Sequence, residues 1–114
     1  MKPRNNPQRL YAWDLAHKVF SEHETPPLLV CADPNPKKCL TMQTAPSISF
    51  PEFTSRLDSI PKDREIIFYC ESALDSAAAE RASEYLEKGY SRAGSLDGGI
   101  EAWNTITGFL PNRR

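Results

Sequence analysis

The apolar residues of this 114-residue chain gather in short runs that are separated by segments with helical spacing. The strongest run, REIIFYC over 64–70, is continuous and rich in β-branched and aromatic side chains, which predicts a strand buried on both faces. A second run, PPLLVCA over 26–32, predicts another short buried strand bounded by proline, which cannot donate to a β-ladder. SISFP over 47–51 and AGSL over 93–96 predict two further short strands.

Helical spacing recurs between these runs. Residues 11–20 place apolar side chains at intervals that predict an amphipathic helix, and residues 51–60 do the same over a shorter length. The segment SAAAERASEYLEKGY over 76–90 consists largely of good helix formers, with Gly89 as a C-terminal stop. A last helix is predicted over 100–108.

Strands that alternate with helices predict an α/β fold with a central, mostly parallel sheet flanked by helices on both faces. The length allows one domain, predicted over 10–114, while the polar residues 1–9, with two prolines, predict a loose N-terminal arm. In open α/β sheets, ligands bind beyond the carboxyl ends of the strands. Cys70 falls at such an end, which makes it the first candidate for chemistry.

Composition and charge exclude several classes of protein. The net charge of −1 gives no electrostatic reason to expect nucleic acid or an anionic membrane as a partner. No segment has the length of an apolar membrane span or the pattern of a secretory signal, so a cytoplasmic location is expected. The cysteines Cys31, Cys39 and Cys70 form no Cys-x-x-Cys pair, so we expect reduced thiols and no metal centre.

Two interpretations of Cys70 are open at this point. A strand that ends at a cysteine and soon gives way to a helix directs backbone N–H groups and the positive helix end at the sulfur. Such an environment lowers the pKa of a thiol and favours the nucleophilic thiolate. Alternatively, Cys70 is a small buried side chain without chemistry, because free cysteines are among the most buried residue types.

The second half of the chain resembles the rhodanese-like (sulfurtransferase) domain family. The likeness covers about 60–111 and includes the strand IPKDREIIFYC, the loop CESALD, the following helix and LDGGIEAWNTITGFLP. The family ending Leu-x-Gly-Gly-x-x-Ala-Trp is matched by Leu96, Gly98, Gly99, Ala102 and Trp103. The resemblance implies a single-domain rhodanese-like fold.

The resemblance also implies a reaction at Cys70. In this family the strand delivers a cysteine that accepts a sulfane sulfur as a persulfide and passes it to a thiophilic acceptor. The substrate-binding loop would supply the backbone amides of Glu71, Ser72, Ala73, Leu74, Asp75 and Ser76. A ring of N–H donors stabilises an anionic persulfide, so no cofactor or metal is required. The implied partners are a sulfur donor, either a small molecule or a protein persulfide, and a thiol acceptor; the oligomeric state is left open.

The chain departs from the family pattern at some positions. Members usually carry Asp-x-Arg at the end of the first strand, where this chain has Val30 and Ala32. They often carry a basic residue or a hydroxyl near the end of the cysteine loop, where this chain has Asp75. A carboxylate there, with Glu71, repels an anion, so poor use of thiosulfate is predicted. Alternatively, Asp75 turns away and caps the helix.

Three further interpretations follow from the same residues. A non-catalytic or regulatory rhodanese-like module that binds a partner protein is the alternative to an enzyme. Phosphate-ester hydrolysis is disfavoured, because Ser76 follows Asp75 and the nearest arginine, Arg81, lies a helical turn onward. Cys31, expected at the same edge of the sheet as Cys70, is either a resolving thiol that attacks an oxidised or persulfidated Cys70 or a small core side chain.

Overall fold

Four parallel strands form one sheet in the part of the chain that the structure describes. This structure is a computed structural model and describes residues 7–23, 25–33, 35, 47–71 and 77–109. The strand order is β1-β4-β3-β2 and every neighbouring pair is parallel. The strands are β1 (Gln8–Leu10), β2 (Leu28–Cys31), β3 (Ile66–Tyr69) and β4 (Ala93–Leu96). The predicted α/β architecture with a parallel sheet is confirmed.

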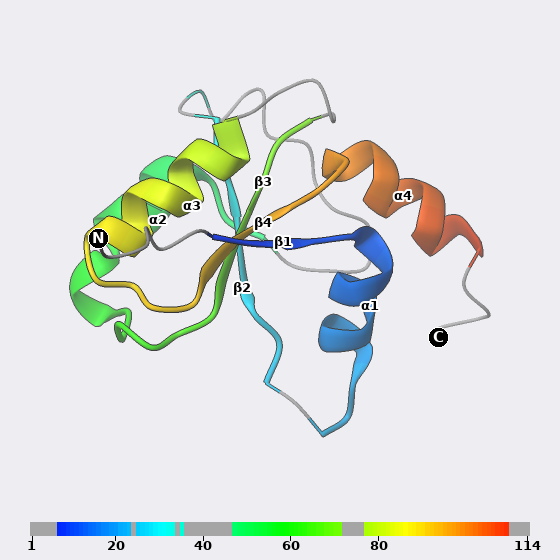
Figure 1. The fold of residues 1–114 in the computed structure, drawn as a ribbon, viewed down its shortest axis with the longest axis horizontal. Helices are drawn as coiled ribbons and strands as arrows, with labels where there is room; N and C mark the ends of the chain where they lie inside the picture. Colours follow the sequence, from blue (N-terminus) through cyan, green and yellow to red (C-terminus); the bar gives the residue numbers. More distant parts are fainter. Residues whose placement is uncertain (1–6, 24, 34, 36–46, 72–76, 110–114) are drawn as a thin grey trace, which may run out of the picture.

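Helices cover both faces of the sheet (Figure 1). The helices α1 (Ala12–Phe20) and α4 (Gly99–Phe109) pack on one face. The other face is covered by α2 (Phe50–Ser55), the short 3-10 helix η2 (Leu57–Ser59) and α3 (Ala77–Glu87). Each face therefore has its own hydrophobic core, and the two cores are separated by the sheet.

The central strand β3 contributes to both cores. Ile67 and Tyr69 belong to the core under α1 and α4, whereas Ile66, Phe68 and the following Cys70 belong to the core under α2 and α3. All five side chains are buried. Because successive side chains of a strand point to opposite faces, a strand that is covered on both sides must be apolar throughout. This explains the continuous apolar run that predicted the strand.

The N-terminal strand β1 was not predicted. Gln8, Arg9 and Leu10 pair with Gly94, Ser95 and Leu96 of β4, so the prediction of a loose arm was wrong for Gln8 and Arg9. Residues 1–6 lie outside the described residues. The strand is held by main-chain hydrogen bonds at the sheet edge, where only Leu10 is buried. A single buried side chain leaves no periodic pattern from which a strand could be predicted.

The predicted strand over 47–51 is reduced to one bridge. Ile48 forms a parallel bridge with Val30, in which the Cys31 N–H donates to the Ile48 carbonyl oxygen at 2.9 Å and the Ile48 N–H donates to the Leu29 carbonyl oxygen at 3.0 Å. The helix α2 begins two residues later, at Phe50. Ser49 ends the extended segment by capping the helix, because its Oγ accepts from the Glu52 N–H at 3.2 Å. Pro51 in the first turn needs no intrahelical donor. Local capping therefore overrides the weak strand pattern.

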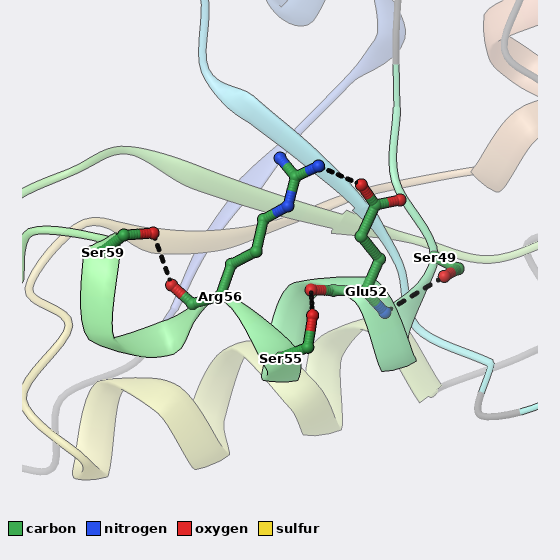
Figure 2. A network of polar contacts seen from close by, with 5 residues as sticks. All are labelled: Ser49, Glu52, Ser55, Arg56 and Ser59. Atoms are coloured by element: carbon green, nitrogen blue, oxygen red, sulfur yellow. Dashed lines mark hydrogen bonds and ion pairs between the residues drawn. The ribbon is translucent and has the colours of Figure 1, made fainter.

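A network of polar contacts continues along α2 and η2 (Figure 2). Ser55 Oγ donates to the carbonyl oxygen of Glu52 at 2.7 Å, and Ser59 Oγ donates to that of Arg56 at 2.8 Å. Arg56 pairs with the Glu52 carboxylate one helical turn back. These contacts lie on the exposed side of the segment, while Phe53 is fully buried beneath it. The short helix is thus held by the apolar contacts of Phe53 and Phe50, and its exposed side is stabilised by the polar contacts.

Candidate functional site

Cys70 lies immediately after β3, at the carboxyl edge of the sheet. It is a free cysteine with an exposed fraction of only 3%, and its side chain joins the core that also contains Ala32 and Ala78. The adjacent Glu71 is exposed. The other predicted loop residues, Ser72, Ala73, Leu74, Asp75 and Ser76, lie outside the described residues. The structure thus buries the side chain of Cys70 in the same core as Ala32 and Ala78, at the carboxyl edge of the sheet.

A glycine turn holds the main chain at Cys70 in place. The Ile100 N–H donates to the Cys70 carbonyl oxygen at 2.9 Å, and the Glu101 N–H donates to that of Glu71 at 3.3 Å. These two amides belong to the first turn of α4, where N–H groups have no partner within the helix. Gly98 and Gly99, with φ of +89° and +66°, direct the chain from β4 into that turn. The double glycine therefore positions a helix end against the cysteine.

The rest of the Leu-x-Gly-Gly-x-x-Ala-Trp sequence follows from the same turn. A Cβ atom added at Gly98 would come within 2.7 Å of the Ala102 Cβ, so both positions must be small. Trp103 is fully buried between the sheet and α1, with its ring 6.0 Å from that of Phe20. It anchors α4, and thereby the amides that contact the Cys70 segment.

Cys31 does not share the environment of Cys70. The register pairs Cys31 with Tyr69, so these two side chains face α1 and α4, whereas Cys70 faces α2 and α3. Cys31 is also disulfide-bonded, so the expectation of reduced thiols was wrong for this residue. Cys39 lies outside the described residues. The structure therefore does not bring the predicted resolving thiol to the face of the sheet that carries Cys70.

Arg81 also lies near this edge, although it was not predicted to be a site residue. Its Nε donates to the carbonyl oxygen of Ala32 at 3.3 Å, and its guanidinium carbon lies 3.8 Å from the centre of the Phe50 ring. Arg81 also pairs with Glu84 at 3.1 Å. Ala32 is the position where the family resemblance leads one to expect an arginine. Arg81 could have been predicted from its position four residues after Ala77, because that spacing places it one turn into α3.

Arg81 lines a cavity of about 230 Å³ that reaches Ala32, directly after β2. The walls are formed by the residues that follow β2 and begin α3, together with polar side chains of the first turns of α3. The lining residues are Ala32, Ala77, Glu80, Arg81 and Glu84. This cavity combines a cationic group, two carboxylates and two methyl groups at the edge where Cys70 lies.

Two tyrosines near the site have a raised pKa. Burial raises the pKa of Tyr69 and outweighs the opposing effect of its 2.9 Å hydrogen bond with Ser47. Burial also raises the pKa of Tyr85, helped by Glu84 and Tyr90 and opposed by Arg81. Both phenols are therefore protonated at neutral pH. Within the described ranges, no group of three His, Cys, Asp or Glu residues is arranged to hold a metal ion, and no helix could cross a membrane.

Comparison with known proteins identifies related sequences and folds. The family model of the rhodanese-like domain matches residues 28–106. A sulfurtransferase from Allochromatium vinosum is 45% identical over 49 residues, which cover 42% of this chain and 43% of that protein. The aligned part is thus less than half of the relative.

Solved structures share the fold. The BH2092 protein of Bacillus halodurans aligns with a TM-score of 0.67 and 24% identity over 87% of this chain and 72% of its own. The single-domain sulfurtransferase RDL2 of Saccharomyces cerevisiae aligns with a TM-score of 0.58 and 21% identity over 94% and 96% of the two chains. A rhodanese-like domain protein of Staphylococcus aureus aligns with a TM-score of 0.55 and 18% identity, covering 84% of this chain and 90% of its own.

Proposed function

Because the chain belongs to the rhodanese-like domain family, we propose that it is a sulfurtransferase that carries a sulfane sulfur on Cys70. The observation that carries this proposal is the position of a free cysteine directly after the central strand, with its main chain held by the first turn of α4. A nucleophile that is fixed in this way needs little reorganisation when it reacts. The sulfurtransferase of Allochromatium vinosum supports the same reaction class.

The reaction consists of two displacements at sulfur. The Cys70 thiolate attacks the terminal sulfur of the donor, the bond between that sulfur and the donor breaks, and the donor leaves with the electron pair. In the second step an acceptor thiolate attacks the outer sulfur of the Cys70 persulfide. The bond from that sulfur to Cys70 breaks, and the Cys70 thiolate is regenerated. No electrons are exchanged with a cofactor in either step.

Thiosulfate is proposed to be a poor donor. Glu71 is exposed directly after Cys70, and Glu80 and Glu84 line the neighbouring cavity, so an approaching dianion meets several carboxylates. Like charges a few ångströms apart repel by up to ~4 kcal/mol at an effective dielectric constant of ~20, and less where water screens them. Raising the ionic strength should therefore increase kcat/KM with thiosulfate more than with an uncharged donor.

The test of the proposal is the intact mass of the protein after incubation with a low-molecular-weight persulfide. We expect a gain of one sulfur atom, mapped by peptide analysis to Cys70 and released as thiocyanate by cyanide. Cys70→Ser should abolish both the gain and the thiocyanate, whereas Cys31→Ser, on the opposite face of the sheet, should retain them. A Cys70→Ser variant that still yields thiocyanate at the parental rate would overturn the proposal.

A non-catalytic module that binds a partner protein is the second candidate. It is favoured by the 3% exposed fraction of Cys70 and by Ala32 at the position where the family usually has arginine. The two functions differ in the reactivity of the thiol. Alkylation of Cys70 near neutral pH at a rate above that of free cysteine supports the enzyme, and a rate below it supports the module.

A further inference from the structure

We propose that Arg81, Glu80 and Glu84 form the subsite that selects the sulfur acceptor, and that this acceptor is a small amino-acid thiol. The molecule that the subsite fits carries a carboxylate and an ammonium group in addition to its sulfur. This inference rests on the proposed sulfurtransferase function, because it names the substrate class of the second step. It assigns a role to a cavity that the transfer of sulfur to Cys70 does not itself require.

The cavity lies close to Cys70. The Ala32 N–H donates to the Tyr69 carbonyl oxygen at 2.8 Å, so Ala32 continues β2 beside the position of Cys70. Both side chains belong to the same core, so they lie on the same face of the sheet. Neighbouring strands are about 5 Å apart, which places the Ala32 wall of the cavity roughly one strand spacing from Cys70.

The guanidinium of Arg81 is held in place by three contacts. The Phe50 ring lies against its guanidinium, the Ala32 carbonyl oxygen accepts from Nε, and Glu84 Oε1 accepts from Nη1 at 3.1 Å. The side chain is only about one quarter exposed. A guanidinium has five N–H donors, so these contacts leave donors on Nη1 and Nη2 for a ligand. A fixed planar fork is well suited to bind a carboxylate.

The cavity lining carries charges of both signs. Glu80 and Glu84 are four residues apart on α3 and therefore share one side of the helix. The three charged side chains of the lining, one Arg and two Glu, carry a net charge of −1, so a ligand with only negative charge is repelled, and a ligand with only positive charge offers no acceptor to the N–H donors of Arg81. A zwitterion satisfies both, with its carboxylate on Arg81 and its ammonium on the glutamates. The volume of about 230 Å³ is below the ~300–1,000 Å³ of sites for drug-sized ligands, which indicates a small molecule.

In the reaction, the subsite acts on the second displacement only. The zwitterionic end of the acceptor is held in the cavity while its thiolate attacks the outer sulfur of the Cys70 persulfide. The new sulfur–sulfur bond forms on the acceptor, and the bond to Cys70 breaks with return of the electron pair to the Cys70 sulfur. The acceptor leaves as an amino-acid persulfide. Arg81 and the two glutamates exchange no proton or electron in this step.

The experiment compares four thiols as acceptors for the preformed Cys70 persulfide of the full chain. L-cysteine carries both charged groups, N-acetyl-L-cysteine lacks the ammonium, L-cysteine methyl ester lacks the carboxylate, and 2-mercaptoethanol lacks both. With rates expressed per thiolate, we expect L-cysteine to be at least tenfold faster than each of the others, because each missing group removes a charge-assisted contact. Equal rates for the four thiols in the parent protein would overturn the inference.

Variants of the cavity residues test whether these residues cause the selectivity among the four acceptor thiols. Arg81→Gln should lower the rate with L-cysteine and N-acetyl-L-cysteine about tenfold while leaving 2-mercaptoethanol within twofold. Arg81→Lys should retain part of the rate that Arg81→Gln loses, because lysine keeps the positive charge but lacks the planar guanidinium group. Arg56→Gln, directly after α2 and outside the cavity lining, is the matched control and should leave all four rates unchanged. Glu80→Gln should reduce the difference in transfer rate between L-cysteine and N-acetyl-L-cysteine.

The outcomes separate this inference from the proposed function. Loss of sulfur loading at Cys70 in the parent protein contradicts the proposed function. Normal loading, with discharge that falls equally for all four thiols in Arg81→Gln, contradicts the inference and leaves the function intact, because it indicates a structural role for Arg81. The thiol series in the parent protein decides the question even if Arg81→Gln does not fold.

Discussion

The N–H of Ile100 donates to the carbonyl oxygen of Cys70 at 2.9 Å, and this contact joins the start of α4 to the end of the central strand. It explains why a double glycine some thirty positions after the cysteine belongs to the same site. Gly98 and Gly99 turn the chain so that the first amides of α4 point at the cysteine segment, and Trp103 fixes the helix in the core. The position of the nucleophile therefore depends on residues that are distant from it in the chain.

Gly98→Ala should destabilise the protein. Gly98 has a φ of +89°, and an added Cβ would lie 2.7 Å from the Ala102 Cβ. We expect the free energy of unfolding in urea to fall by about 1–3 kcal/mol, because both the backbone conformation and the contact are unfavourable. Combining the change with Ala102→Gly removes the contact but keeps the unfavourable φ, so stability should return only in part. A variant as stable as the parent contradicts this explanation of the turn.

Gly94→Ala should displace β1 from the sheet. A Cβ at Gly94 would meet the carbonyl oxygen of Gln8 at 2.7 Å, and backbone of a neighbouring strand cannot easily give way. We expect faster hydrogen exchange at residues 8–10 and a loss of about 1–3 kcal/mol in the free energy of unfolding. The amides that pair β2 with β3 serve as an internal control and should keep their protection. Unchanged exchange at residues 8–10 would show that the edge strand tolerates the methyl group.

Glu65→Gln tests a buried ion cluster at the amino edge of the sheet. The Glu65 carboxylate is 8% exposed and contacts Lys18 Nζ at 3.1 Å and Arg92 Nη2 at 3.5 Å. Loss of its charge should lower the free energy of unfolding by about 1–3 kcal/mol, mainly through Lys18, since Arg92 is largely exposed. Glu52→Gln is the matched control. It breaks the exposed pair with Arg56 in Figure 2, and its effect should stay within about 0.5 kcal/mol.

Tyr69→Phe should reduce the loss of stability that accompanies a rise to alkaline pH. Burial raises the pKa of Tyr69 above 10.0, so the folded state keeps a proton that the unfolded state loses. The resulting stabilisation is complete below the unfolded pKa and is lost as pH rises through the folded pKa, with a slope of at most about 1.4 kcal/mol per pH unit. Urea unfolding between about pH 8 and 11 should therefore decline less steeply in the variant. Parallel curves for variant and parent would contradict this assignment.

Cys31→Ala should lower the stability of the protein without lowering its rate of sulfur transfer. The Cys31 side chain lies on the face opposite Cys70 and is buried with an exposed fraction of 2%. We expect the rate of sulfur transfer, measured with reductant present, to stay within about twofold of the parent. The free energy of unfolding without reductant should fall by about 2–4 kcal/mol, because a disulfide is lost. Loss of transfer in a folded variant, as judged by circular dichroism, would restore the resolving-thiol hypothesis.

The sequence by itself determined the α/β architecture and the position of the candidate nucleophile. Ile66–Tyr69 is apolar at every position because both of its faces are covered, so its own composition predicts a central strand. Cys70 follows directly, and the edge of a parallel sheet at which it falls is fixed by chain direction alone. Gly98 and Gly99 mark a turn because few other residues adopt a positive φ. Each of these features is local in the chain.

Only the tertiary structure decided which of these residues face each other. Cys31 ends β2 and Cys70 directly follows β3, yet the register that pairs Cys31 with Tyr69 sends the two cysteine side chains to opposite faces of the sheet. A shift by one residue would have reversed this result, and a strand that is apolar at every position has no alternating pattern from which the register could be predicted. The contact of Arg81 with Phe50 likewise joins helices that are distant in the chain. Such pairings depend on how elements pack, which the order of residues within one element does not specify.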